Sequence, residues 1–236
     1  MLNFRRIIKI SLIISCLFYF NQTVFGQEEY DLESEIYPKL KTSCCAITLA
    51  GAKCHAANTM KTYIEALKDA GVAKDDIFLK VAKKFSLDSI FDKQIRLKVE
   101  KTLIEKFGDK RPQVMIDPAT FDFGQVSKGQ GKVTHIFKIH NKGNSDLIIN
   151  NIYSACPCTT ASLKIGENKS KFFDTRGAPK DWQVILKSNK VAELEVVLDL
   201  SHESANIGHL VRKIIVLSND PLYPSISAVV TAQVQK

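Results

Sequence analysis

The sequence lacks the short motifs by which several enzyme classes are recognised. It has no G-x-S-x-G, no H-E-x-x-H and no glycine-rich loop of the type that holds phosphate groups. No pair of acidic residues stands out as a general acid and base. These absences argue against serine hydrolases, zinc peptidases and nucleotide-binding enzymes, so the sequence favours a protein that is not an enzyme.

The chain also has no basic tract with interleaved aromatic residues, although its formal net charge is +8. Positive charge that is spread among acidic residues is a weak indication of nucleic-acid binding. There is no internal repeat and no low-complexity tract, and glycine and proline are not enriched. The 236 residues are therefore expected to form one large or two modest domains that bind no nucleic acid.

The apolar run at the N-terminus, residues 10–20, is well short of the roughly 20 residues that cross a bilayer as a helix. It follows three basic residues within positions 5–9 and precedes small residues at 24–26. This order is typical of a secretory signal. We expect residues 1–26 to be a signal peptide, so that the protein is periplasmic or secreted. It would contact a membrane only through an uncleaved signal.

Residues 27–112 have the apolar spacing of three short amphipathic helices. Gly71 is expected to end the first helix, Asp75 or Asp76 to begin the second, and Ser89 to cap the third. The charged segment 108–112 contains a glycine and a proline and is the expected linker. The predicted buried residues are Met60, Tyr63, Ile64 and Leu67, then Ile77, Phe78, Val81 and Phe85, and finally Ile90, Phe91, Ile95, Val99, Leu103, Ile104 and Phe107.

From residue 113 to 236 the apolar residues alternate with polar ones, which is typical of half-buried strands. The clearest alternation is in residues 192–200, and a last strand is predicted over 226–234. Residues 211–217 include apolar residues at both odd and even positions, so both faces of the strand are expected to be covered, which indicates a central strand. About seven strands are predicted, enough for two packed sheets. The predicted fold class is α + β, a small helical domain followed by an all-β sandwich.

A turn is predicted where the strand that contains Phe137 and Ile139 ends in N-K-G, at residues 141–143. Glycine and asparagine tolerate positive φ, which tight turns require. Leu147 and Ile149 then begin the next strand. We therefore predict that the two strands pair as an antiparallel hairpin.

Several separated motifs of the second half resemble a bacterial family of secreted immunoglobulin-like domains of unknown function. These motifs are F-D-F-G at 121–124, N-x-G at 141–143, C-x-C-T at 156–159 and S-N-D-P at 218–221. The family is similar to the ASH/hydin and PapD-like sandwiches. The resemblance implies an immunoglobulin-like fold, although such frames carry many unrelated functions. The chain departs from the family at Pro157 and in a longer insert, residues 163–183.

The helical part faintly resembles the N-terminal domain of the cytochrome c maturation protein H type, a periplasmic thiol-disulfide component. The shared features are a cysteine cluster before a helix, an apolar face that includes Met60 and Ile64, a glycine, and an acid-capped helix that ends at Phe85. The C-x-x-C of that family is replaced here by Cys44-Cys45 followed by Cys54.

The N-terminal cysteines allow three interpretations. A disulfide from Cys54 to Cys44 or Cys45 would close a short loop next to the first helix and stabilise it by roughly 2–3 kcal/mol. The alternatives are a thiol-redox site and a soft-metal site that includes His55. C-x-x-C-H, the signature of covalent haem attachment, is absent.

The pair Cys156 and Cys158 is equally open. Two small apolar thiols could fill a turn, form a disulfide with each other or with an N-terminal cysteine, or bind a soft ion such as copper(I). After removal of the signal the cysteines would number five, so one is left over whatever pairs form.

The insert after this motif combines Phe172, Phe173 and Trp182 with several basic residues. Aromatic residues ringed by charge are favoured at protein interfaces. The three aromatic residues are therefore candidates for partner binding next to the cysteine turn, and the alternative is that they only cover the core.

We predict an exported, non-enzymatic binding or scaffold protein that contacts another envelope protein through its sandwich and needs no cofactor. The alternative is a periplasmic thiol-redox or copper-handling protein, linked to cytochrome c maturation, that uses both cysteine clusters.

The first testable prediction concerns export. The intact mass of the exported protein should correspond to a chain that begins at Gln27, because residues 24–26 supply the small residues that a signal peptidase requires. A full-length chain retained in the membrane would contradict it.

Overall fold

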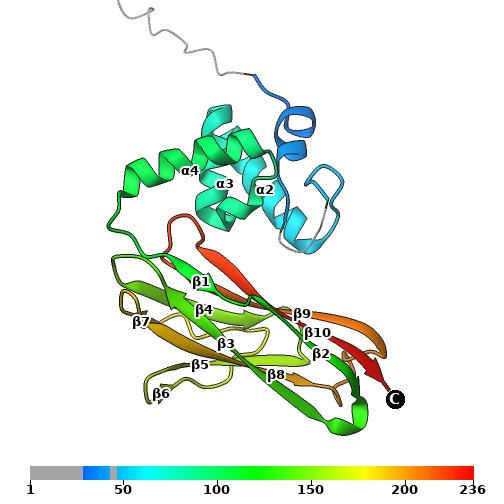
Figure 1. Cartoon of the computed structure of the whole chain (residues 1–236). Coiled ribbons are helices and arrows are strands. Elements are labelled where there is room, and N and C mark those ends of the chain that lie inside the picture. The colour runs from blue at the N-terminus through cyan, green and yellow to red at the C-terminus, as the bar shows by residue number, and fades with distance from the viewer. Residues whose placement is uncertain (1–28, 43–46) are drawn as a thin grey trace, which may run out of the picture.

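Two units follow each other along the chain, one helical and one built of strands. The computed structural model describes residues 29–42 and 47–236. The predicted signal and the pair Cys44 and Cys45 lie outside the described residues. The α + β fold class is confirmed, and Figure 1 shows the helices gathered at one end of a two-layer sandwich.

The helical unit begins with two short turns and continues with three α-helices. None of the helices in the described ranges is long and apolar enough to cross a membrane. The elements are η1 (Leu32–Ile36), η2 (Tyr37–Lys39), α2 (His55–Asp69), α3 (Lys74–Phe85), η3 (Leu87–Ser89) and α4 (Lys93–Phe107). The three predicted helices are thus present.

The helix ends show why α4 starts later than expected. The N–H groups of Gln94 and Ile95 donate to the Asp92 side chain, so Asp92 is the N-cap. Ser89 is buried in η3, and the prediction that it caps the third helix was wrong. Gly71, with φ of +71°, follows α2 as predicted and has the conformation that a helix end favours.

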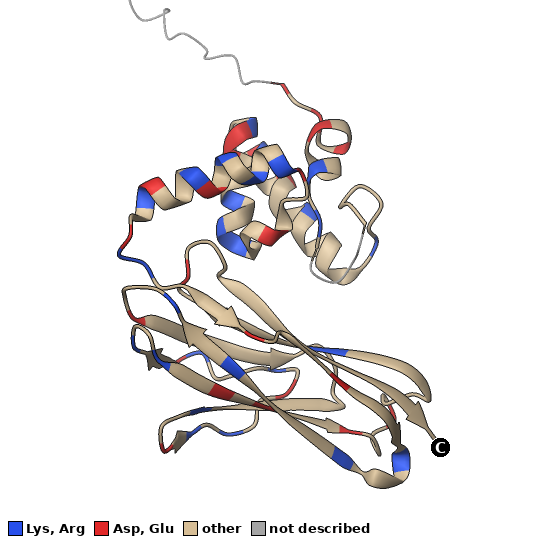
Figure 2. Ribbon diagram, in the orientation of Figure 1, with Lys and Arg blue, Asp and Glu red and all other residues tan. Residues whose placement is uncertain are grey.

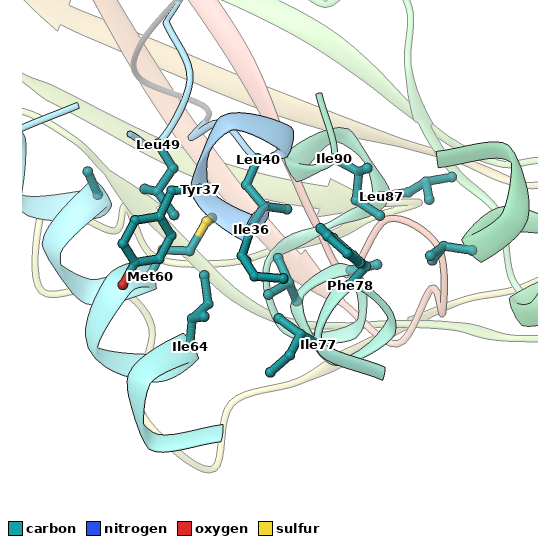
Figure 3. Close-up of a cluster of buried hydrophobic side chains, with 14 of the residues drawn as sticks. Ile36, Tyr37, Leu40, Leu49, Met60, Ile64, Ile77, Phe78, Leu87 and Ile90 are labelled. Carbon is teal, nitrogen blue, oxygen red and sulfur yellow. The ribbon is translucent and has the colours of Figure 1, made fainter. Parts of the chain in front are cut away.

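One cluster of buried apolar side chains holds the helical unit together. Figure 3 shows residues from η1, η2, α2, α3 and η3 converging on it. Phe91, Ile104 and Phe107 are 54%, 37% and 41% exposed, which corrects their predicted burial. Phe91 precedes α4, so the helical period does not apply to it. The fully or nearly fully buried members include Ile36, Tyr37, Leu40, Leu49, Met60, Ile64, Ile77, Phe78, Leu87, Ile90 and Leu103.

The second unit contains two five-stranded sheets, with the orders β1-β3-β8-β5-β6 and β2-β10-β9-β4-β7. Ten strands form where about seven were expected, because short edge strands add to the frame. Apart from these additions, the arrangement matches the two sheets of an immunoglobulin-like sandwich. The strands are β1 (Val114–Ile116), β2 (Thr120–Ser127), β3 (Lys132–Asn141), β4 (Leu147–Ser154), β5 (Thr159–Ile165), β6 (Asn168–Lys169), β7 (Val184–Leu186), β8 (Val191–Asp199), β9 (Gly208–Ser218) and β10 (Ser225–Gln235).

The predicted strand faces agree with the structure. Every second residue of β8, from Ala192 to Leu198, is buried, and so are the corresponding residues of β10 from Ala228 to Val234. Strand β9 lies between β10 and β4, which confirms its predicted central position.

The predicted hairpin of β3 and β4 is wrong. Strand β3 pairs with β1 and β8, whereas β4 pairs with β7 and β9 in the other sheet. The connection therefore crosses from one sheet to the other, with Asn141 fully buried. The Asn141 side chain donates to the carbonyls of Ser145 and Leu186 and accepts from the N–H of Gly143.

Gly143 is required at this crossing because the chain passes close to the linker. A Cβ atom at this position would lie 2.1 Å from the carbonyl oxygen of Arg111. The glycine that suggested a hairpin turn in fact permits this close approach.

The turn between β9 and β10 joins the two units. Its Leu222 is buried in the helical core, and the N–H of Leu87 donates to the Leu222 carbonyl at 2.8 Å. The buried Asp220 shapes this turn. Its Oδ1 accepts from the N–H groups of Leu222 and Tyr223, and its Oδ2 accepts from the N–H of Val114 at 2.8 Å.

The second prediction follows from Asp220. Replacing it with alanine leaves two buried N–H groups and one partly buried N–H group without this acceptor, so Asp220→Ala should lower the free energy of unfolding by about 3–5 kcal/mol. Asp220→Asn keeps one acceptor oxygen for the turn, so it should lower the free energy of unfolding by less than Asp220→Ala does. Denaturant unfolding followed by circular dichroism measures both.

The exposed Asp181 is the control, and Asp181→Ala should change stability by less than about 0.5 kcal/mol. Equal stability of the Asp220→Ala and Asp181→Ala variants would show that the buried carboxylate does not hold the junction.

Candidate functional site

The C-P-C motif forms the connection between β4 and β5, so it crosses from one sheet to the other at the end of the sandwich far from the helices. A tight turn fixes it, because the N–H of Thr159 donates to the carbonyl of Cys156 at 3.1 Å. Ser154 adds two bonds: its hydroxyl donates to the Cys156 carbonyl and accepts from the Cys156 N–H. The backbone on both sides of the two thiols is therefore held in place.

The two sulfur atoms of the motif lie 2.7 Å apart. A disulfide bond is about 2.05 Å long, so the pair is close to bonding distance. Cys158 is buried in a cluster with Leu198, Leu200 and Leu210, whereas Cys156 is half-buried at its edge. The two thiols thus differ in access to solvent.

Arg212 of β9 completes this cluster. Its Nε donates to the Sγ of Cys158 at 3.0 Å, and its terminal nitrogens donate to the carbonyls of Ser204 and Val211. These bonds hold a fixed positive charge against a buried sulfur. Sequence reasoning missed Arg212. This residue lies two positions from each of the buried residues Leu210 and Ile214, so the alternation along β9 could have indicated a charge on its inward face.

The shifts in pKa follow from this geometry. Burial, together with the hydrogen bond to Cys158, raises the pKa of the Cys156 thiol above its ordinary value. Burial is the largest single influence on the Arg212 guanidinium and lowers its pKa, but the hydrogen bonds and charge interactions with Cys158 and Cys156 together outweigh burial and raise the pKa. Arg212 is therefore a permanent cation, and Cys156 is protonated at neutral pH when it is reduced.

The N-terminal cysteine cluster lies elsewhere. Cys54 is the residue before α2 and packs against the helical core, and His55 is exposed as the first residue of that helix. The proposed pairing with Cys44 or Cys45 falls outside the described residues. The structure therefore does not bring Cys54 together with Cys156 and Cys158, which lie at the opposite end of the sandwich. Among the described residues, no group of three or more potential metal ligands occurs.

The insert predicted over residues 163–183 begins within β5, and the part that follows this strand, residues 166–183 (from here on the insert), closes the edges of both sheets. Ala161 of β5 exchanges backbone hydrogen bonds with Phe173, and on the other sheet the N–H of Ser154 in β4 donates to the carbonyl of Asp174. The Asn151 side chain also accepts from the N–H of Ala178 at 2.9 Å. The insert therefore protects two strand edges that would otherwise present unpaired backbone groups.

The three aromatic residues of the insert differ in exposure. Phe173 is 6% exposed and packs edge-on against Trp182, with ring centroids 4.9 Å apart, so it belongs to the core. Trp182 is half-buried beside it, and Phe172 is 45% exposed, with Lys169 over its ring. Of the three candidate contact residues, only Phe172 and part of Trp182 are accessible.

A shallow hollow lies between β6 and β7 at the open edge of the sandwich. It is lined by Leu163, Ile165, Lys169, Trp182, Val184 and Ile185, with Asn168 and Ser170. Ile185 is 49% exposed at its border. The hollow lies near the C-terminal end of β5, about 20 Å along the strand from the cysteine turn. The aromatic surface and the cysteines are thus separated, although Asp174 reaches the end of β4.

The comparisons with known proteins concern the sandwich. Residues 114–170 match the model of a family described as a protein of unknown function, DUF1573. This supports the resemblance to an immunoglobulin-like family of unknown function. No curated protein matches the chain.

Several solved structures are similar to about half of this chain at low sequence identity. A protein of unknown function from Porphyromonas gingivalis W83 is 16% identical, with a TM-score of 0.40, over 53% of this chain and 49% of that one. The ASH/PapD-like domain 7 of human CEP192 is 14% identical, with a TM-score of 0.35, over 55% and 89% of the two chains. The periplasmic chaperone SfaE is 12% identical, with a TM-score of 0.33, over 52% and 58%.

This chain therefore spans about half the length of the Porphyromonas protein. None of these matches supports the resemblance of the helical part to the cytochrome c maturation protein H type.

The third prediction concerns Cys54. If it forms the expected disulfide, Cys54→Ser should lower the melting temperature of the oxidised protein, since loss of such a loop closure costs about 2–3 kcal/mol. The same substitution should have little effect on the fully reduced protein. A thiol at Cys54 that titrates freely, with an unchanged melting temperature, would instead support the redox interpretation.

Proposed function

We propose that this protein is an exported, non-enzymatic binding or scaffold protein of the bacterial envelope that contacts a partner protein through its immunoglobulin-like sandwich. The hollow between β6 and β7 is the observation that carries this proposal. It combines apolar side chains from both sheets with Lys169 at its border and Phe172 next to Lys169. Apolar pockets with a polar border are favoured for anchoring side chains of partner proteins.

The exposed apolar residues at this edge are costly in water. Ile185 and Phe172 are about half-exposed, and burial of such side chains in an interface gains roughly 25 cal/mol for each Å² of apolar surface. Figure 2 shows that charged residues are dense on the helices, whereas β4, β9 and β10 carry few. Strand β7, which lines the hollow, pairs with β4, so the hollow borders strands that carry few charges.

The envelope location rests on the signal predicted for residues 1–26. The two proposals are linked, because a partner in the envelope requires export. Binding through side chains is also consistent with the covered edges of β4 and β5, since the insert already occupies the backbone groups of these strands.

Within the part of the chain that the structure describes, the alternative function, thiol-redox or soft-metal handling, is supported at one place, the cluster of Cys156, Cys158 and Arg212. This cluster suits a disulfide better than a metal ion. Two thiolates that share a zinc ion lie about 2.3 Å from it and hence roughly 3.8 Å from each other. The sulfurs here are 2.7 Å apart, and the guanidinium that contacts Cys158 opposes a cation. Copper binding stays a prediction, and a link to cytochrome c maturation stays part of this alternative.

The fourth prediction tests the contact surface. Ile185→Asp introduces a charge at the border of the hollow and should weaken retention of the partner at least tenfold in copurification from the native envelope, which corresponds to about 1.4 kcal/mol. Phe172→Ala should weaken retention in the same direction. Both side chains are exposed, so melting temperatures should change little.

The matched control is Ile207→Asp, because Ile207 is 56% exposed outside the hollow, just before β9. It should leave copurification unchanged. Equal recovery of all partners with Ile185→Asp, or equal losses with Ile207→Asp, would contradict the assignment of the hollow as the contact surface.

A further inference from the structure

We propose that Cys156 and Cys158 form a thiol-disulfide exchange site, with Arg212 as the positioning residue, that accepts two electrons from a dithiol of another protein. This function goes beyond the proposed binding function, gives a specific reaction to the thiol-redox alternative at this cluster, and does not depend on the hollow. The proposal rests on three features of the site: the distance between the sulfurs, their unequal exposure, and the cation next to the buried one.

The turn prepares the two sulfurs for bond formation. They are 2.7 Å apart in a segment whose backbone is fixed by Ser154 and Thr159. Pro157 between them restricts φ and limits the conformations that the reduced pair samples. Closure of the disulfide thus requires only a small movement of the side chains towards the length of about 2.05 Å.

The unequal exposure assigns a different role to each sulfur. Cys156 is half-buried and is the sulfur that an incoming thiolate can reach, whereas Cys158 is 1% exposed. Arg212 donates to Cys158 at 3.0 Å and is itself fixed by the carbonyls of Ser204 and Val211. A fixed guanidinium stabilises a thiolate at Cys158, and a stabilised thiolate is a better leaving group.

The exchange is balanced in two steps. In the first, a thiolate of the partner attacks Cys156 Sγ in the oxidised pair; the Cys156–Cys158 bond breaks, and Cys158 leaves as a thiolate held by Arg212. In the second, the other thiolate of the partner attacks its own sulfur in the mixed disulfide, and Cys156 leaves and takes up a proton. The partner dithiol is oxidised to a disulfide, and Cys156 and Cys158 are reduced.

Burial of Cys156 agrees with this order. Its raised pKa makes it the thiol that is protonated after the second step, while the cation remains at Cys158.

The test equilibrates the whole protein with glutathione and its disulfide at graded ratios, followed by acid quenching, alkylation and trypsin digestion. Residues 143–164 form one tryptic peptide that contains Cys156 and Cys158 and no other cysteine. Cys44 and Cys45 fall in a second peptide and Cys54 in a third, so mass spectrometry reads the C-P-C pair by itself. We expect this peptide to change from dithiol to internal disulfide with a two-electron dependence on the glutathione ratio.

Two variants isolate the role of Arg212. Arg212→Gln should destabilise the reduced form and shift the equilibrium at least tenfold towards the disulfide, which is about 30 mV for a two-electron couple. Arg212→Lys keeps the charge and should shift it less. Arg176→Gln removes an exposed arginine that is paired with Asp174 and should leave the midpoint unchanged.

Circular dichroism checks that each variant is folded; if Arg212→Gln is not, Arg212→Lys and the wild type still test the pair. A peptide that remains a dithiol at every ratio, or a disulfide that no ratio reduces, would overturn the exchange site. A midpoint that is the same in the wild type and in every folded Arg212 variant would overturn the role of Arg212.

Cys156→Ser should abolish mixed disulfides with glutathione at this peptide, and their persistence at Cys158 would overturn the order of attack.

Discussion

A single buried carboxylate, that of Asp220, stabilises the junction between the helical unit and the sandwich. Its two oxygens accept from the first residue of β1 and from the turn between β9 and β10, so one side chain ties the linker to the sandwich. The same turn carries Leu222 into the helical core. A charged group without solvent is stable only when its hydrogen bonds are complete, and here the backbone of three residues completes them. The contact with the helices is then made by Leu222, which lies in the turn that Asp220 holds.

At the opposite end of the sandwich a positive charge, that of Arg212, is also held by hydrogen bonds. Arg212 projects from the inward face of β9, where burial alone would make a cation unfavourable. Two carbonyls and the sulfur of Cys158 satisfy three of its donors. The half-buried Arg212 and the buried Cys158 therefore stabilise each other, because the guanidinium donates a hydrogen bond to the Cys158 sulfur.

Between the two ends, the insert 166–183 decides which surfaces remain available. By pairing with β5 and following β4, it covers two edges that would otherwise attract extended segments of other chains. It also brings Trp182 and Lys169 together with Ile185 of the facing sheet. The surface left for contact is thus formed of side chains, and it lies well away from the thiols. A binding function and an exchange function can coexist on one sandwich because they occupy separate places.

The sequence by itself determined the local elements and their buried faces. The alternation in β8 and β10 and the helical spacing of α2 and α3 were sufficient, since periods of two and 3.6 residues follow from backbone geometry alone. What only the tertiary structure decided was which strands pair and which charges meet. The crossing at Asn141 resembled a hairpin because both use asparagine and glycine, but here these residues contact the linker and Leu186 while the flanking strands join different sheets. Arg212 and Cys158 are far apart in the chain, so no local pattern joins them. Hydrogen bonds that satisfy buried charges depend on distances through space, and a linear sequence does not contain those distances.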